Sequence, residues 1–229
     1  MALSADWIAR YHRRVSAGRG GKKREGPPDV LGDQLLAAWM AGEENAFRDL
    51  FRAYRSLVYG VLRNLMPGDP ELDDVVQTAF LEVFRSLDSF QGRSKLSSWV
   101  ARVALNVGYH HIRRKRSRPS DYRTESIGDV HFDERASSDP EAVVAGAEAT
   151  QRVQIILASL APKKRTVFIL NDLQGLPQEE VAEIVGASVA TVRTRLFYAR
   201  KEFWRRAAKD PVLRDLVPSE ADEKARGSA

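Results

Sequence analysis

Apolar residues recur at helical spacing through most of the chain, and no segment alternates in the way that predicts a strand. Between residues 32 and 116 the repeat is broken near Gly42, at "MPGDP" (66–70) and at "SFQGRSKLSS" (89–98). Ser98 is a candidate cap for the helix that follows the last break. The clearest stripe spans four turns and comprises Leu72, Val75, Val76, Ala79, Phe80, Val83, Phe84 and Leu87. Helical spacing resumes near Val143, so the pattern predicts an all-α protein.

Polar segments divide this helical chain. The N-terminal stretch is Gly-rich and basic, and the stretch after the first helical region is rich in Ser and Asp and contains prolines. Both compositions are typical of flexible segments, as is the charged end of the chain. We therefore predict two helical domains, 31–116 and 143–210, joined by a flexible linker, 117–142, and flanked by a basic extension, 1–30, and a tail, 211–229.

The second helical region contains a helix-turn-helix pattern, "GLPQEEVAEIVGASVATVRTRLFYARKEFWRR" (175–206). Pro177 suits a first helical turn, Gly186 a sharp turn with positive φ, and Ser188 the cap of the second helix. The predicted buried stripe of that helix is Val192, Leu196, Ala199 and Phe203. Its other face carries no acid before Glu202 and consists of Thr191, Arg193, Thr194, Arg195, Phe197, Arg200 and Lys201.

This basic face favours DNA binding over a hairpin with a merely solvated surface. An Arg side chain can donate two hydrogen bonds to guanine in the major groove, and Thr or Phe can contact a thymine methyl group. A helix-turn-helix alone does not say which class of DNA-binding protein carries it.

The first helical region ends in a second basic element, "ALNVGYHHIRRKR" (104–116). His110 and His111 point about 100° apart on a helix, so they do not form a metal site together. The four cations 113–116 complement a helix C-terminus, but their number favours a surface that grips a phosphate backbone. The polar loop just before this helix, with Phe90, Arg93 and Lys95, is suited to holding an unstacked base.

An acidic face lies beside the clearest stripe, where Asp73, Asp74 and Gln77 fall and where Leu81 is on the polar side. Acidic groups do not favour phosphate, so this face meets a protein or water. Periodicity alone favours the solvated face.

Bulk composition narrows the function classes. The chain of 229 residues has a net charge of +5, which suits a polyanionic partner, and 0 cysteines, which excludes disulfides and thiolate zinc sites. No apolar run reaches the length of a membrane span or of a signal-peptide core, so a cytosolic protein is expected. A DNA-processing enzyme would need a nucleophile or a metal-binding carboxylate set, and the adjacent Asp73 and Asp74 diverge. A conventional regulator would dimerise on a palindrome, and no dimerisation segment is obvious.

Three segments in order resemble the extracytoplasmic-function sigma factors of bacterial RNA polymerase: "GEENAFRDLFRAY", "DPELDDVVQTAFLEVFRSLDSFQGRSKLSSWVARVALNVGYHHIRRKR" and "LNDLQGLPQEEVAEIVGASVATVRTRLFYARKEF". The resemblance covers residues 33–208 and departs at residues 1–30 and at Pro177, where many relatives have a polar cap. It implies a sigma-2-like and a sigma-4-like domain that bind core polymerase, recognise −10 and −35 promoter elements and assist melting, without catalysis or a cofactor. A conventional helix-turn-helix regulator remains the alternative.

The resemblance also implies roles for individual residues. The polymerase-binding set, on the β′ clamp helices, is Asp73, Asp74, Gln77 and Phe80. The −10 set is Phe90, Gly92, Arg93, Ser94, Lys95, Asn106, His110, Arg113 and Arg114. The −35 set is Ser188, Thr191, Arg193, Thr194, Phe197, Arg200 and Lys201. Further implied partners are the β flap of the polymerase and an anti-sigma factor. The resemblance implies that this chain is located in the bacterial cytoplasm. The anti-sigma factor would keep it inactive there or hold it at the membrane.

Overall fold

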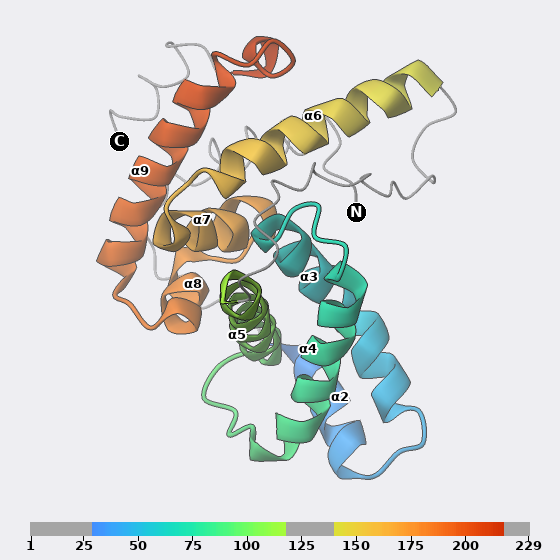
Figure 1. Ribbon diagram of the computed structural model, residues 1–229. Helices are drawn as coiled ribbons and strands as arrows, with labels where there is room; N and C mark the ends of the chain where they lie inside the picture. The colour runs from blue at the N-terminus through green and yellow to red at the C-terminus, as the bar shows by residue number, and fades with distance from the viewer. Residues whose placement is uncertain (1–28, 118–139, 218–229) are drawn as a thin grey trace.

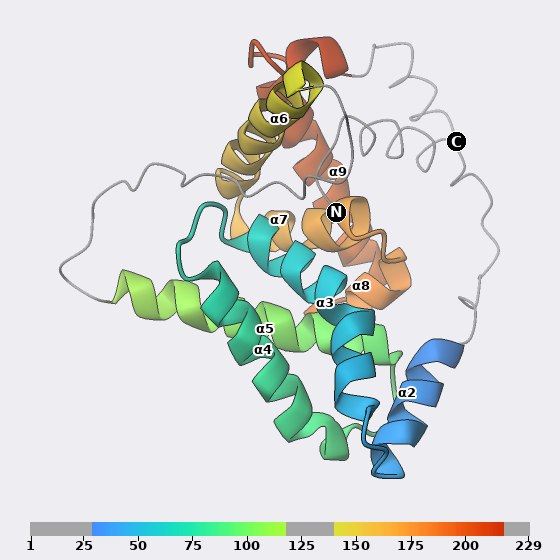
Figure 2. The ribbon, with the colours of Figure 1, turned by 90° about the vertical axis from the view of Figure 1, so that its right-hand side faces the viewer.

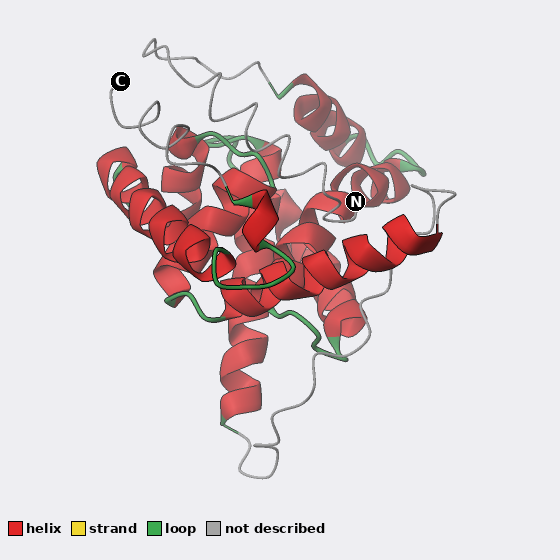
Figure 3. Cartoon of the chain, turned by 90° about the horizontal axis from the view of Figure 1, so that it is seen from above, coloured by secondary structure: helices red, strands yellow, loops and turns green. Residues whose placement is uncertain are grey.

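The computed structural model describes residues 29–117 and 140–217, and every regular element in these ranges is helical (Figure 3). The α-helices are α2 (Val30–Met40), α3 (Ala46–Leu65), α4 (Leu72–Ser86), α5 (Leu96–Arg116), α6 (Pro140–Ala158), α7 (Pro162–Phe168), α8 (Gln178–Val185) and α9 (Val189–Ala207). Two 3₁₀ turns, η1 (Leu87–Ser89) and η3 (Arg214–Leu216), and one π-helical turn, η2 (Ile169–Leu173), complete the described chain. The predicted all-α fold class is confirmed. The predicted extension, linker and tail lie largely outside the described residues.

Helices α2 to α5 form the first helical unit, in which α3 and α4 pack on α5. Its chain breaks fall where the pattern predicts them, since α2 ends just before Gly42, whose φ is 71°, and α3 ends at Leu65. Gly108 of α5 lies against side chains of α3. A Cβ atom there would lie 2.8 Å from methyl carbons of both Leu62 and Leu65, so a larger residue would force these two side chains to move.

Helices α6 to α9 form the second unit around a smaller core. Phe168 of α7 stacks on Phe203 of α9 with ring centroids 4.9 Å apart, and Trp204 meets Phe203 edge-on at 5.1 Å. The other members of this core include Val153, Leu157, Leu160, Ala199, Ala207 and Leu213. The stripe predicted for the helix-turn-helix is buried as expected, with Val192, Leu196, Ala199 and Phe203 at most 1% exposed.

The turn between α8 and α9 has the predicted local chemistry. Gly186 ends α8 in the left-handed conformation, with φ 61° and ψ 44°, and the Ala187 N–H bonds to the Ala182 carbonyl at 3.0 Å. Ser188 caps α9 by accepting a hydrogen bond from the Thr191 N–H at 3.1 Å. The angle between the two helices is therefore set by a residue that needs positive φ and by a cap.

Gly186→Ala is expected to lower the free energy of unfolding by about 1 kcal/mol, because an L-residue resists the left-handed conformation. A Cβ atom there would meet nothing within 4 Å, so the backbone alone sets the cost. Gly146→Ala is the matched control, since Gly146 is also open to a Cβ but lies inside α6. There the exchange should raise stability by up to about 1 kcal/mol. Urea unfolding of both variants measures the two signs, and equal signs would refute the turn geometry.

The predicted cap at Ser98 is wrong. Helix α5 begins at Leu96 with Lys95 as its extended N-cap residue, so Ser98 already lies in the first turn. Its side chain is buried, and its hydroxyl donates to the Glu180 carboxylate of α8 at 3.1 Å. A local pattern does not reveal a partner that is 82 residues away in the sequence.

The two units pack directly against each other. Helix α5 lies between α3 and α4 on one side and α8 on the other, as the views in Figures 1 and 2 show together. One apolar core passes through this junction, and it joins residues of α3, α4 and α5 to Val167, Leu170, Val181, Ile184, Val192 and Leu196. This arrangement brings the loop before α5 next to the first turn of α8.

Candidate nucleic-acid and polymerase interfaces

The outer face of α9 is open to solvent from Arg193 to Lys201. Arg193, Thr194 and Lys201 are exposed, and Phe197 keeps 61% of its surface accessible. An aromatic ring that is this exposed gains little free energy from burial in the free protein, and it would gain more if a partner covered it. The face therefore has the cations and the apolar contact that major-groove reading requires.

Tyr198 extends this surface and is absent from the sequence-based set. Its ring is 52% exposed and meets Phe197 edge-on with centroids 5.3 Å apart. The sequence contained a signal that could have identified Tyr198, because this residue is aromatic, lies outside the buried stripe and directly follows another aromatic residue. The tyrosine adds a hydroxyl donor and acceptor beside the apolar ring.

Four members of the predicted −35 set have partners inside the protein, and one of them is Thr194, whose hydroxyl donates to the Ala190 carbonyl at 3.0 Å. Arg200 bonds both carboxylate oxygens of Asp172, at 2.5 and 3.0 Å, and the Asn171 side-chain oxygen at 2.9 Å. Ser188 and Thr191 are engaged in the cap of α9. Arg200 thus clamps α9 to the π-helical turn η2 in this conformation and does not project from the exposed face.

A second clamp holds α9 on α7. The Glu202 carboxylate accepts hydrogen bonds from Lys164 at 3.0 Å and from Arg206 at 2.7 Å. The hydrogen bond from Lys164 is the main cause that holds the pKa of Glu202 below its ordinary value. Because the folded pKa is lowered, this contribution to stability is present at neutral pH and is lost as the pH falls through that pKa.

The loop between η1 and α5 presents its predicted residues in two ways. Gly92, with φ 64°, and Arg93 are exposed at the tip, whereas Phe90 is half-buried against Trp99 with centroids 5.4 Å apart. Lys95 turns toward α8, where its Nζ lies 2.6 Å from Glu180 Oε1. The loop therefore offers an aromatic wall and an exposed cation, with a second cation already engaged.

The basic end of α5 forms one continuous exposed face. Asn106, His110 and Arg113 lie at helical spacing and are all exposed, with Arg114 beside them. His111 points inward instead, where its Nε2 lies 3.1 Å from the Asp69 carboxylate. The structure thus separates the adjacent histidines as predicted, and no group of metal-binding side chains forms within the described ranges.

The acidic face of α4 is solvent-exposed at Asp73, Asp74 and Gln77. Phe80 is not part of that face, because it is only 4% exposed and packs against Phe51 with centroids 4.6 Å apart. Its predicted contact with a partner does not fit this position, and Phe80 supports the helix from the core. Leu81 takes its place on the surface, with 52% of its area accessible.

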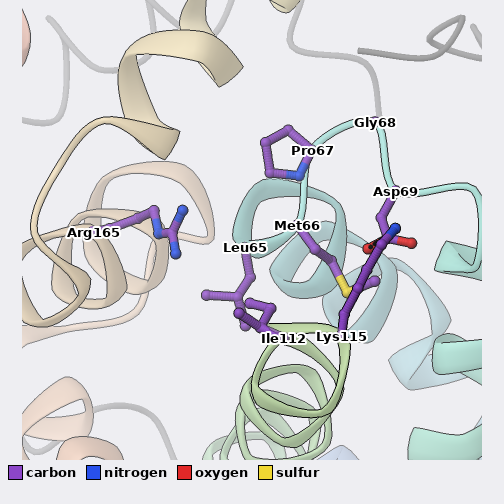
Figure 4. A pocket seen from close by; sticks show the side chains of 8 residues that line it. All are labelled: Leu65, Met66, Pro67, Gly68, Asp69, Ile112, Lys115 and Arg165. Atoms are coloured by element: carbon purple, nitrogen blue, oxygen red, sulfur yellow. Dashed lines mark ion pairs between the residues drawn. The ribbon is translucent and has the colours of Figure 1, made fainter. Parts of the chain in front are cut away.

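A cavity of about 280 Å³ lies at the junction of the two units. Its apolar floor comes from the end of α3 and from Ile112 of α5, and Figure 4 shows Arg165 of α7 opposite Lys115 and Asp69. Lys115 Nζ lies 3.6 Å from the Asp69 carboxylate. The cavity contains none of the residues predicted to read DNA.

None of the described helices is long and apolar enough to span a membrane.

Comparisons with known proteins identify the family to which the two helical regions belong. The model of sigma-70 region 2 matches residues 50–118, and that of sigma-70 region 4 matches residues 150–203. The ECF RNA polymerase sigma-E factor of Escherichia coli is 32% identical over 178 residues, which cover 76% of this chain and 93% of that protein. The RNA polymerase sigma-H factor of Pseudomonas aeruginosa is 29% identical over 186 residues, which cover 80% and 95%.

Two solved structures share the fold at a TM-score of 0.57. CnrH in complex with the cytosolic domain of CnrY is 24% identical, and the match covers 80% of this chain and 97% of CnrH. The sigma factor RpoE of Bartonella quintana, in complex with the anti-sigma factor NepR, is 21% identical, and the match covers 70% and 96%. With both family regions matched in order and a relative above 30% identity matched over nearly its whole length, the chain belongs to the extracytoplasmic-function sigma factors of the sigma-70 family.

Proposed function

We propose that this sigma factor directs core RNA polymerase to promoters through three surfaces, each assigned to one partner. Family membership makes the chain a transcription initiation factor that binds core polymerase and promoter DNA. The observation that carries the assignment is the exposed Arg, Thr and aromatic face of α9 on a chain whose α4 is acidic and whose α5 is basic. The chain contributes binding energy and performs no catalytic step of its own.

The face of α9 reads the −35 element in the major groove. Arg193 donates to base edges, Thr194 and Lys201 contact the groove wall and phosphates, and Phe197 covers an apolar base edge. Tyr198 joins this set because it is exposed beside Phe197. Arg200 acts as a positioning residue, since its guanidinium is bonded to Asp172 and Asn171.

The loop before α5 and the basic face of α5 act on the −10 element. The tip of the loop, with Gly92 and Arg93, receives an unstacked base against the wall formed by Phe90 and Trp99. Asn106, His110, Arg113 and Arg114 hold the adjacent strand by its phosphates. Unstacking a base costs a few kcal/mol, which stacking and phosphate contacts together offset, so melting follows from differential binding.

The acidic face of α4 is the proposed docking surface for the β′ clamp helices of the polymerase. Asp73, Asp74 and Gln77 precede the exposed Leu81 by one to two turns of the same helix, so one apolar anchor lies at the end of a polar surface.

Leu81→Glu is therefore expected to weaken binding to core polymerase by about tenfold or more, because a buried anchor becomes an unpaired charge. Ile155→Glu is the matched control, since Ile155 is 42% exposed on α6, away from this face. Fluorescence titration of each labelled variant with core polymerase measures the affinities. Equal affinities of the two variants would remove the assignment of this face.

An anti-sigma partner completes the proposal. One of the solved structures with the shared fold is a sigma factor in complex with an anti-sigma factor, and in another CnrH is in complex with the cytosolic domain of CnrY. We place this chain in the bacterial cytoplasm, where the polymerase acts. The anti-sigma partner would transmit signals from the membrane to this chain. A conventional dimeric regulator is disfavoured, because the matched regions occur in the order of a polymerase subunit.

A further inference from the structure

The net positive charge of the chain lies ahead of its first described helix. Residues 1–28 of the basic extension contain 7 of the 36 Arg and Lys and 2 of the 31 Asp and Glu, a balance of +5 that equals the net charge of all 229 residues. The rest of the chain keeps 29 basic and 29 acidic side chains, so its charges cancel. The two helical units therefore have local basic faces without an overall attraction to a polyanion, and the extension supplies that attraction.

The cations of the extension are grouped. Lys22, Lys23 and Arg24 form a run of three, and Glu25 is the one acid between this run and Asp29. Short basic runs without interleaved acids are typical of segments that bind a phosphate backbone. They also occur in solvated tails, so the place where the run joins the fold decides between the two interpretations.

That place is next to the helix that carries the −10 residues. Residues 1–28 lie outside the described ranges, and the first described residue is Asp29. Asp29 caps α2, because its Oδ1 accepts a hydrogen bond from the Gly32 N–H at 3.2 Å, and its Oδ2 accepts one from the Ser97 N–H at 3.4 Å. Ser97 lies in the first turn of α5, two residues after Lys95. The extension is therefore attached beside the loop assigned to the −10 element.

The run of three cations can reach the DNA on either side of that loop. Lys22 precedes Asp29 by seven residues, and an extended chain spans at most about 3.6 Å per residue, so Lys22 reaches no farther than about 25 Å from Asp29. Successive phosphates of one strand lie about 3.4 Å apart along a duplex, so this reach corresponds to about seven nucleotides. Phosphates that flank the −10 element are thus within range of all three cations.

We propose that the basic extension, through Lys22, Lys23 and Arg24, binds the phosphate backbone of promoter DNA beside the −10 element. Contacts to phosphates carry no base information, so the extension strengthens binding without changing which promoters are chosen. Its contribution falls as the salt concentration rises, because it comes from the release of counterions. The placement beside the −10 element rests on the proposed function of the loop, whereas the binding of phosphates does not.

The first test removes the three cations from the full chain by Lys22→Gln, Lys23→Gln and Arg24→Gln. The matched control is Arg48→Gln, Arg52→Gln and Arg55→Gln, which removes the same charge from three exposed side chains of α3. The probe is a fluorescently labelled DNA duplex of random sequence, titrated at several salt concentrations between about 50 and 200 mM.

The extension variant is expected to bind this duplex about tenfold more weakly than the control at the lowest salt concentration. Each lost phosphate contact lowers the slope of log affinity against log salt by about 0.9, so the slope should fall by about 2 to 3. An equal loss in both variants would show a general effect of net charge and would overturn the proposal. An unchanged slope in the extension variant would overturn it as well.

The second test locates the extension on a promoter. The chain has 0 cysteines, so Gly21→Cys introduces a single thiol beside the run and leaves every cation in place. The thiol is labelled with iron–EDTA, and the labelled chain is assembled with core polymerase on a promoter at which the unchanged chain starts transcription. Strand cleavage is expected within about eight nucleotides of the −10 element. Cleavage confined to the −35 region, or no cleavage, would contradict the placement.

The two tests separate this inference from the proposed function. If the unchanged chain starts no transcription with core polymerase, the proposed function fails, and the titration with random duplex still decides whether the extension binds phosphates. If it does start transcription, the extension variant should use the same start sites at lower yield. Different start sites would show that the extension reads bases, against the proposal.

Discussion

A chain carrying both Arg193→Ala and Phe197→Ala is expected to lose about hundredfold or more in promoter-dependent initiation. A bidentate Arg–guanine contact is worth about 1–3 kcal/mol of discrimination, and the loss of an apolar base contact adds to it. Both side chains lie on the open face of α9, and Phe197 is 61% exposed. Truncating them should therefore change the free energy of unfolding by no more than about 0.5 kcal/mol.

Arg205→Ala is the matched control for this pair. Arg205 is exposed on the same helix but lies two turns beyond the first half of α9 that carries Arg193 and Phe197. Initiation assays with core polymerase, together with thermal unfolding, separate a lost DNA contact from a lost fold. Equal activities of Arg205→Ala and the double variant would show that this face does not read DNA. Tyr198→Phe in the same assay isolates the contribution of the tyrosine hydroxyl.

The second large effect is expected inside the protein, at the clamp between α9 and η2. Arg200→Ala should lower the free energy of unfolding by about 3 kcal/mol, because it leaves the Asp172 carboxylate, whose side chain is 2% exposed, without its bidentate cation. Exposure of the Arg200 side chain, at 27%, keeps the effect at the lower end of the range for buried pairs.

A double-mutant cycle identifies the cause. Arg200→Ala combined with Asp172→Asn should be less destabilising than the sum of the single changes, because no unpaired buried charge remains. Urea unfolding at neutral pH measures all three variants. If Arg200→Ala instead leaves the free energy of unfolding unchanged and lowers only promoter binding, Arg200 is a DNA contact and its bonds to Asp172 do not stabilise the fold.

Local rules predicted much of this fold. The stripe of α9 is buried as its spacing requires, because tertiary packing here follows the helical period. Gly186 occupies the turn because glycine adopts positive φ, and Ser188 caps α9 because its side-chain oxygen accepts a hydrogen bond. Each property belongs to a single residue, so it can be read from the sequence. The divergence of His110 and His111 also follows from the helical period, with His110 exposed and His111 buried.

Long-range pairing set the limits of prediction. Arg200 looks like a DNA-facing cation until Asp172, 28 residues upstream, is placed beside it. Ser98 looks like a cap until Glu180 is found at its hydroxyl. Phe80 and Leu81 are different, because the helical period already placed Phe80 in the apolar stripe and Leu81 on the polar side, as their exposure confirms. For Arg200 and Ser98 the deciding partner belongs to another helical element, so no local pattern contains it.

The central claim is most directly tested by run-off transcription from a library of promoters with core polymerase, in the presence and absence of this chain. New discrete start sites that need the chain, and that disappear when Arg193 and Phe197 are replaced with Ala, are the predicted result. The absence of new starts and of polymerase binding, together with a DNA footprint from the chain alone, would contradict the account.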